Sequence, residues 1–471
     1  MAYLTMDRRQ FLKATGAGAA AISMTDLGVA LAEAATKGGV RKGRILKPDQ
    51  KLRLAGIGCG GKGESDIMNS VEAGAEVVAL CDADLKRGAN VFKKFPDVPK
   101  YRDFRKMLIE MDDKIDGVTV STPDHMHFPA AMMAISMGKH VYVQKPMAHT
   151  IWEARTLTEA VRKHQVISQM GNQGHAGEGI RLVREWIQSG GIGDVREVHI
   201  WCNRPIWPQG PLDRGQVAPV PETLDWNAWL GVAPFREYTT LPVKEDGKKN
   251  DRNNTPSPYL PFKWRGWWDF GCGALGDMAC HQMDAAFWGL NLKYPVSVEA
   301  TSEGCTADTA PLRSKIIYQF PARGKMPPVT MFWYDGDNSS QVCPRPKGLE
   351  ENRKMPSSGQ YILGEKGTIF DETDYCRSPR LIPESAMQTF KRPPKTIPRV
   401  PQANPHLEWI TACHGGPKPG SNFDYAGPFA ETVLLGNLAV RVGKKVMWDG
   451  RNMRADLPEA QKLVRKSYRV F

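Results

Sequence analysis

The nine cysteines of this chain include no Cys-x-x-Cys pair. Structural zinc modules are usually built on that spacing, so the sequence excludes a zinc finger or zinc ribbon and predicts no metal site. An odd number of cysteines leaves at least one thiol unpaired. Cys59 and Cys81, which lie in the first domain, are expected to be buried and reduced.

The sequence also lacks a concentrated patch of positive charge, although its formal net charge is +12. The lysines and arginines are scattered, and neither an RNP-like nor a zinc-finger pattern accompanies them. These absences argue against a nucleic-acid partner. The basic stretch from Lys462 to Arg469 is expected to be a solvated tail.

The sequence has no convincing membrane span, because its N-terminal apolar segment, Ala14 to Ala32, is short and rich in alanine and glycine. That segment follows Arg8-Arg9-Gln10-Phe11-Leu12-Lys13, which resembles the twin-arginine export signal. No cysteine follows to accept a lipid anchor. We therefore predict a signal over residues 1–34, the Tat export machinery as a partner, and a periplasmic protein exported in its folded state.

The most informative feature is a short apolar run that turns directly into Gly-x-Gly-x-x-Gly. Gly56 allows the tight turn, Gly58 lets the backbone approach a pyrophosphate, and Gly61 allows close packing of helix on strand. The next strand ends in Asp82, about 20 residues after the loop, where a ribose-binding carboxylate is expected. The pattern predicts a dinucleotide site, and an ordinary strand–helix turn is the alternative.

Strand and helix patterns alternate through the first part of the chain, which predicts an α/β domain with a doubly wound parallel sheet. The predicted strands are 52–57, 76–81, 115–120, 139–143 and 166–170, and the predicted helices are 62–72, 86–94, 104–111, 128–137 and 152–164. A further helix over 179–188 and a strand over 195–201 are predicted, after which the pattern changes to a loop-rich region over 203–270. Later apolar runs over 296–301, 315–320 and 329–334 predict strands of a second, mainly antiparallel sheet.

Two of the predicted strands end in polar residues at the edge where ligands of parallel sheets bind. Thr122, Pro123 and His127 follow one strand, and Lys145 follows the next. His127 would either contact a cofactor or cap the following helix. Lys145 would either stabilise alkoxide character on a substrate oxygen or be a solvated lysine. The local sequence leaves both alternatives open.

Asp277 and His281 lie four residues apart, so they share one face of a predicted helix. A carboxylate beside an imidazole orients it and raises its basicity, which suits a general base acting on a sugar hydroxyl. The spacing also fits two metal ligands, but a third is not evident. An acid in the first turn of a helix with a histidine in the core is the structural alternative.

Together these motifs resemble the Gfo/Idh/MocA oxidoreductase family over about residues 51–450. The resemblance implies a Rossmann domain and a C-terminal α/β domain whose large open, mainly antiparallel sheet supports a dimer or tetramer. It implies His281 as acid/base, Asp277 as its orienter or a substrate ligand, and Lys145 as their electrostatic partner. The implied cofactor-binding residues are Gly56, Gly58, Gly61, Asp82, Thr122, Pro123, His127 and Lys145.

The chain departs from the family motif at Gln144, where the family usually has Glu before the Lys-Pro pair. This change removes a charge beside the nicotinamide. Asp82 and Asp84 favour NAD, whereas the nearby Arg87 keeps NADP possible. We predict a tightly bound cofactor, since free NAD is scarce outside the cytoplasm. The predicted domains are a flexible arm over 35–50, the Rossmann domain over 51–172 and a substrate and oligomerisation domain over 173–471.

The predicted substrate is a carbohydrate, because indole rings stack on sugars and polar side chains bind their edges. The candidate substrate-binding residues are Asn172, His175, Arg204, Trp207 and Trp268. Core packing is the alternative role for the tryptophans. Three functions remain open: hydride transfer from a secondary hydroxyl of a sugar, glycoside or polyol, redox-assisted glycoside cleavage without net oxidation, and sugar binding without catalysis.

Overall fold

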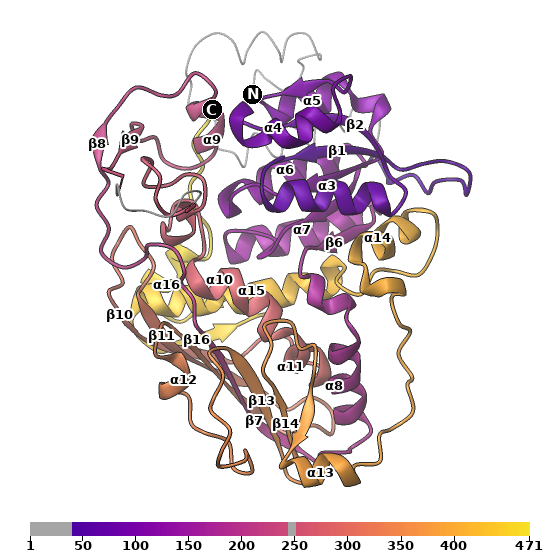
Figure 1. The fold of residues 1–471 in the computed structure, drawn as a ribbon, viewed down its shortest axis with the longest axis vertical. Coiled ribbons are helices and arrows are strands. Elements are labelled where there is room, and N and C mark those ends of the chain that lie inside the picture. The colour runs from indigo at the N-terminus through magenta and orange to yellow at the C-terminus, as the bar shows by residue number, and fades with distance from the viewer. Residues whose placement is uncertain (1–39, 244–250) are drawn as a thin grey trace.

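The computed structural model of the chain describes residues 40–243 and 251–471. The predicted signal and residues 35–39 of the predicted arm lie outside these ranges. Figure 1 shows a smaller sheet with its helices at one end of the molecule and a large sheet at the other. The long helix α15 (Phe423–Val442) runs between them.

The N-terminal domain is a doubly wound sheet with strand order β3-β2-β1-β4-β5-β6, and all its strand pairs are parallel. This confirms the predicted Rossmann fold. Sequence patterns missed β3, which has only two residues. The elements are β1 (Arg53–Ile57), α3 (Lys62–Glu72), β2 (Glu76–Cys81), α4 (Leu85–Lys94), β3 (Lys100–Tyr101), α5 (Phe104–Glu110), β4 (Gly117–Val120), α6 (His127–Ser136), β5 (His140–Val143), α7 (Ile151–His164) and β6 (Ser168–Met170).

The second domain contains a nine-stranded sheet in the order β15-β14-β13-β7-β12-β11-β10-β16-β17. Only β7 and β12 are parallel neighbours, which confirms a mainly antiparallel sheet. Sequence patterns missed five of its strands: β13, which has six residues, and β14, β15, β16 and β17, which have two to four. The strands are β7 (Val195–Cys202), β10 (Ser297–Glu303), β11 (Arg313–Phe320), β12 (Val329–Asp335), β13 (Gly359–Gly364), β14 (Thr368–Asp371), β15 (Arg380–Ile382), β16 (Val446–Asp449) and β17 (Arg454–Ala455).

Helix α15 joins the two domains, because it packs on α7 of the Rossmann domain and on β10 and β11 of the large sheet. Asn422 caps its N-terminus by accepting a hydrogen bond from Asp424 N, and Gly443 ends it in the left-handed region with φ 65°. The other elements are α8 (Glu178–Gln188), β8 (Gln216–Val217), α9 (Trp226–Leu230), β9 (Thr239–Thr240), α10 (Gly273–Gln282), α11 (Asp284–Gly289), α12 (Ser339–Val342), α13 (Glu384–Thr389), α14 (Pro405–Cys413) and α16 (Pro458–Leu463).

Both ends of the described chain are held against the Rossmann domain, unlike the flexible arm and solvated tail that the sequence suggested. Near the start, Leu46 is buried and its N–H donates to Cys413 O at 2.9 Å. Near the end, the Tyr468 hydroxyl donates to Glu153 Oε1 at 2.8 Å. Burial of apolar side chains and hydrogen bonds to buried polar partners explain why both segments pack on the protein. Neither feature is visible in the composition of these segments.

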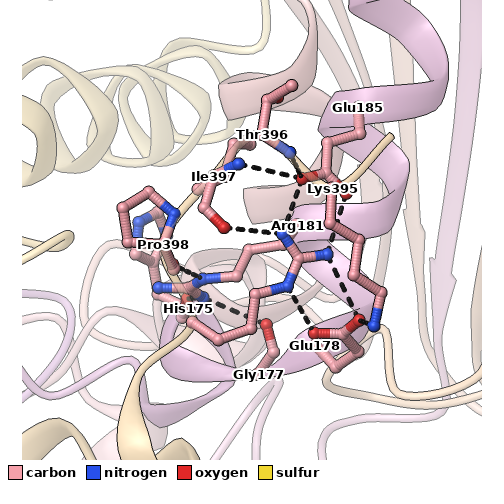
Figure 2. A network of polar contacts seen from close by, with 10 residues as sticks. His175, Gly177, Glu178, Arg181, Glu185, Lys395, Thr396, Ile397 and Pro398 are labelled. Carbon is pink, nitrogen blue, oxygen red and sulfur yellow. Dashed lines mark hydrogen bonds and ion pairs between the residues drawn. The ribbon is translucent and has the colours of Figure 1, made fainter. Parts of the chain in front are cut away.

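An irregular segment, residues 395–399, crosses α8 and is fixed there by two arginines (Figure 2). Arg399 forms ion pairs with Glu178 and Glu185. Arg181 donates to Pro398 O at 2.8 Å and to His175 O at 2.7 Å, which fixes the turn that carries His175. Bidentate arginine contacts of this kind hold a segment without secondary structure.

All nine cysteines are free thiols, and Cys59 and Cys81 are buried, as predicted. No helix within the described ranges is both long and apolar enough to cross a bilayer.

Candidate active site

The glycine loop after β1 has the backbone geometry that a pyrophosphate site requires. Gly58 has φ +81°, and a Cβ there would lie 2.7 Å from Ser121 O. Gly61, at the N-cap of α3, has φ +60° and provides no side-chain cap, so the first N–H groups of the helix are free of side-chain acceptors there. A helix N-terminus of this kind favours an anion.

Asp82 closes the loop from the neighbouring strand. Its carboxylate accepts hydrogen bonds from Cys59 N at 2.8 Å and from Asp84 N at 3.0 Å. Burial raises the pKa of Asp82 to about 6, and the two backbone donors oppose that rise. Arg87 lies over the loop, because a Cβ on Gly61 would be only 2.3 Å from its Nη2 atom. These groups fit the ribose and pyrophosphate of a dinucleotide.

One cavity of about 550 Å³ extends from this loop along the carboxyl ends of the parallel strands into the second domain. Most of the predicted site residues line it, so the three predicted catalytic residues and most of the predicted cofactor residues share a single cleft. They are Gly58, Gly61, Asp82, Thr122, Pro123, Lys145, Arg204, Trp207, Asp277 and His281. Cofactor and substrate sites at this edge are the rule for open α/β sheets.

The centre of the cleft is an ion-pair cluster that joins the two domains. Lys145 Nζ lies 2.7 Å from both the Oδ1 and the main-chain oxygen of Asp277. Arg265 Nε contacts the same Oδ1 at 3.1 Å. Burial would raise the pKa of Asp277, but the charges of Lys145 and Arg265 hold it well below its usual range. Asp277 is therefore a carboxylate between two cations.

His281 follows Asp277 by one turn of α10, and the imidazole is 3% exposed. Its Nδ1 atom has no hydrogen-bond partner among the residues that the structure describes, so Asp277 does not orient it. The ring instead packs edge-on against Tyr375, with 4.9 Å between centroids. Burial and the charge of Lys145 lower the pKa of His281 to about 3. The imidazole is neutral at physiological pH.

Aromatic and cationic side chains of the second domain also line the cleft. The Arg265 guanidinium lies 4.1 Å from the Phe262 ring centroid and 4.2 Å from that of Trp264. Arg204 contacts Asp374 at 3.5 Å. Stacked rings beside fixed charges can hold an apolar sugar face and its hydroxyl edge.

Sequence reasoning assigned no role to several residues of this cleft, among them Tyr375 and Asp124. Tyr375 lies in a loop far from every motif, and nothing near it in the sequence indicates a site. Asp124 was within a recognised motif but received no role. Its Oδ2 accepts from Cys272 N at 3.0 Å, just before α10, and burial raises its pKa to about 6.

Five predicted residues lie outside the lining of the cleft. Asn172 and His175 hydrogen-bond to the buried Asp284, the first residue of α11, at 3.0 and 2.9 Å. Gly56 packs within the Rossmann domain, since a Cβ there would lie 2.6 Å from Ile67. Because Asn172 and His175 are almost fully buried, the geometry does not support the predicted contact of either side chain with a substrate.

His127 and Trp268 complete the set outside the cleft. His127, the first residue of α6, has its Nε2 atom 2.9 Å from Thr122 O, and no side chain of the described residues caps the N-terminus of this helix. Trp268 Nε1 donates to Thr306 O at 3.2 Å, and its ring lines a separate cavity of about 320 Å³. Neither side chain reaches the glycine loop or the lysine.

In residues 40–243 and 251–471, no three histidine, cysteine or carboxylate side chains converge to hold a metal ion.

Sequence comparisons agree with this architecture. Residues 52–172 match the NAD-binding Rossmann fold of the Gfo/Idh/MocA oxidoreductase family, and residues 207–327 match its C-terminal alpha/beta domain. Residues 5–25 match the twin-arginine translocation signal, which indicates export across the cytoplasmic membrane.

Two curated relatives share only part of their length with this chain. A glycosyl hydrolase family 109 protein of Shewanella pealeana is 28% identical over 205 residues, which are 41% of this chain and 45% of that protein. A D-xylose 1-dehydrogenase [NADP(+)] of Haloarcula marismortui is 28% identical over 163 residues, 34% of this chain and 45% of the relative. The chain thus spans about half the length of these relatives.

Among solved structures, the WlbA dehydrogenase of Bordetella pertussis in complex with NADH and UDP-GlcNAcA has the same fold. The TM-score is 0.58 with 17% sequence identity, and the match covers 85% of this chain and 99% of that one. Both domain matches and the glycine loop lead to the same conclusion: this chain is a member of the Gfo/Idh/MocA family of oxidoreductases and contains its NAD-binding Rossmann domain.

Proposed function

We propose that this protein is an exported NAD(P)-dependent oxidoreductase that transfers hydride from a secondary hydroxyl of a sugar, glycoside or polyol. One observation carries the proposal. A neutral His281 and the Lys145–Asp277 pair line the same cleft as the glycine loop and Asp82. A proton acceptor, a fixed positive charge and a dinucleotide site are the three parts that alcohol oxidation needs.

Bound NAD would supply the hydride acceptor. The remaining work falls to the chain's own side chains. Lys145 would hydrogen-bond the substrate oxygen and stabilise its negative charge, while Asp277 keeps the ammonium fixed. His281 would take the hydroxyl proton. Since burial and the charge of Lys145 make this imidazole a weak base, proton transfer depends on stabilisation of the oxygen by Lys145.

A cover over the adenosine end supports tight cofactor retention. Residues 222–225 of the second domain hydrogen-bond across the end of β2: Asp225 N donates to Ala83 O at 2.8 Å and Leu85 N to Thr223 O at 2.9 Å. These contacts lie beside Asp82 and oppose nucleotide release. We propose NAD as the preferred cofactor, because a 2′-phosphate would meet Asp82 and Asp84, while Arg87 leaves NADP usable.

Native mass spectrometry of the protein purified after export tests this proposal. We expect one dinucleotide per chain, together with an absorbance change near the NADH band when a sugar substrate is added. Protein that carries no nucleotide and gains none on NAD addition would refute it. Light scattering of the same sample tests the proposed dimer or tetramer, which the half-buried Ile317 and Phe332 on the open sheet support.

The names of several relatives favour a second function, NAD-dependent glycoside cleavage without net oxidation. Oxidation at C3 would acidify the C2 proton, elimination would release the aglycone, water would add, and the hydride would return to C3. An aryl glycoside distinguishes the two functions. Free aglycone without net NADH would indicate cleavage, and a keto-sugar with stoichiometric NADH would indicate oxidation.

We propose the periplasm as the site of action, because the twin-arginine route exports folded proteins and so allows cofactor loading beforehand. Fractionation of cells expressing the full chain tests this. The expected result is NAD-containing protein in the periplasmic fraction, and an Arg8→Lys/Arg9→Lys variant should remain inside the cell.

A further inference from the structure

A fully buried carboxylate lies directly behind the wall of the cofactor cleft. Asp66, in the second turn of α3, accepts from Ser121 Oγ at 2.7 Å and from Gln144 Nε2 at 2.9 Å on one oxygen. Its other oxygen contacts Lys62 Nζ at 2.9 Å and His406 Nε2 at 3.2 Å. Lys62, Ser121 and Gln144 all line the cleft, so one carboxylate holds three of its side chains.

Asp66 is charged despite its complete burial. Desolvation would raise its pKa, but the hydrogen bond from His406 and the charge of Lys62 outweigh that effect and lower the pKa below its ordinary value. Four donors, two on each oxygen, satisfy the carboxylate. The wall of the cleft therefore contains a fixed negative charge that no local sequence motif marks.

This arrangement explains why residue 144 is glutamine. The Gln144 amide donates to Asp66, whereas a glutamate would bring two carboxylates together and force one of them to hold a proton. Gly171 leaves room for the amide, since a Cβ on residue 171 would lie 2.4 Å from Gln144 Nε2. The surroundings therefore fit an amide at residue 144 and a carboxylate at residue 66.

We propose that Asp66 and Gln144 form a matched pair in which Asp66 carries the negative charge that the family motif places on residue 144. Asp66 is a positioning residue, because it holds Lys62, Ser121 and Gln144 at the cleft and supplies its negative charge from behind the wall rather than by contact with the cofactor. The proposal rests on the proposed function only for the identity of the ligand in the cleft.

The charge of Asp66 has a consequence for the redox state of the cofactor. The nicotinamide ring is positively charged in NAD⁺ and neutral in NADH, so a nearby carboxylate favours the oxidised form. Removal of a unit charge from directly behind the wall of the cleft, at an effective dielectric constant of about 20, is expected to change the relative affinity for the two forms by roughly tenfold. Asp66→Asn is therefore expected to bind NADH more tightly relative to NAD⁺.

Three variants test the pair: Asp66→Asn, Gln144→Glu and the double exchange. Two measurements are made on each full-length protein, the ratio of the NADH and NAD⁺ dissociation constants and the melting temperature of the cofactor-free protein between pH 5 and 8. Gln144→Glu is expected to melt at lower temperature than wild type, and its deficit is expected to grow as pH rises, because two carboxylates must then ionise together. The double exchange is expected to restore most of the melting temperature that Gln144→Glu loses and to return the ratio of dissociation constants most of the way to the wild-type value.

The matched control is Asp116→Asn, which removes a largely buried carboxylate from an ion pair with Arg53 outside the cleft. It is expected to lower the melting temperature without changing the ratio of dissociation constants. An unchanged ratio in Asp66→Asn would overturn the charge assignment. A double exchange that melts no higher than the less stable single variant would overturn the pairing. This melting test does not depend on the cofactor. If the wild type binds no dinucleotide, that result refutes the proposed function instead.

Discussion

The ion pair at the centre of the cleft predicts that Asp277→Asn destabilises the protein. In the wild type, the Asp277 carboxylate faces Lys145 and Arg265, and its side chain is only 14% exposed. The asparagine variant leaves both cations in place without their counter-charge. Desolvated charges that lose their partner are the costly case, because water cannot replace the lost interaction.

The magnitude follows from this geometry. Loss of one partner of a buried pair costs about 3–5 kcal/mol, and the slight exposure of both side chains places Asp277→Asn near 3 kcal/mol. Lys145→Met is expected to cost less, about 2 kcal/mol, because Arg265 still neutralises Asp277. The double variant leaves one unpaired cation instead of two. It is expected to cost roughly 1–2 kcal/mol less than the sum of the single changes.

Urea unfolding of the cofactor-free protein measures these free energies. The pH dependence gives a second check. Since the folded-state pKa of Asp277 is lowered, its stabilisation is present above the unfolded pKa of about 3.9 and is lost as pH falls. The free energy of unfolding of Asp277→Asn should therefore fall less steeply with decreasing pH than that of the wild type. Single-variant costs that add within about 0.3 kcal/mol would refute the coupling of Lys145 and Asp277.

Three further predictions concern the cofactor loop, the base and the domain junction. His281→Ala is expected to abolish turnover and keep bound nucleotide, measured by product analysis and mass spectrometry; unchanged turnover would remove its role as base. Gly58→Ala is expected to lose bound nucleotide, because its φ of +81° and the 2.7 Å approach to Ser121 O exclude a side chain. In the wild type, burial raises the pKa of Asp124 to about 6, so its contribution to stability is present at low pH and is lost as pH rises through that value. Asp124→Asn removes this loss and is expected to raise the free energy of unfolding of the cofactor-free protein at pH 8 by up to about 3 kcal/mol relative to pH 4. Parallel pH profiles of variant and wild type would contradict this.

The sequence alone predicted the parts of the site whose chemistry is local. The glycine loop, Asp82 and Lys145 each follow a strand within a few residues, and parallel strands bring their carboxyl ends to one edge. His281 was also predicted, although for the wrong neighbour: helical spacing placed it beside Asp277, but the carboxylate is occupied by cations from elsewhere in the chain.

The parts that the sequence did not predict depend on contacts between distant segments. Asp66 resembles any polar residue of an amphipathic helix, and only the folded chain brings Gln144 to it. His175 has the residue type of a sugar ligand, yet Asp284 on α11 accepts its hydrogen bond in the core. Residue type indicates what a side chain can bind, whereas the tertiary partner decides whether it is free to do so.

The same long-range contacts decide how the cleft can open. Asp124 with Cys272 and Lys145 with Asp277 cross from the strand ends of the Rossmann domain to α10, so separation of the domains would break both links. Helix α15 packs on both domains and resists that separation. Residues 222–225 of the second domain also bind over the end of β2, where Asp225 N donates to Ala83 O and Leu85 N donates to Thr223 O. Because these backbone hydrogen bonds and the two links to α10 all bridge the domains, opening of the cleft would have to break several of them at once.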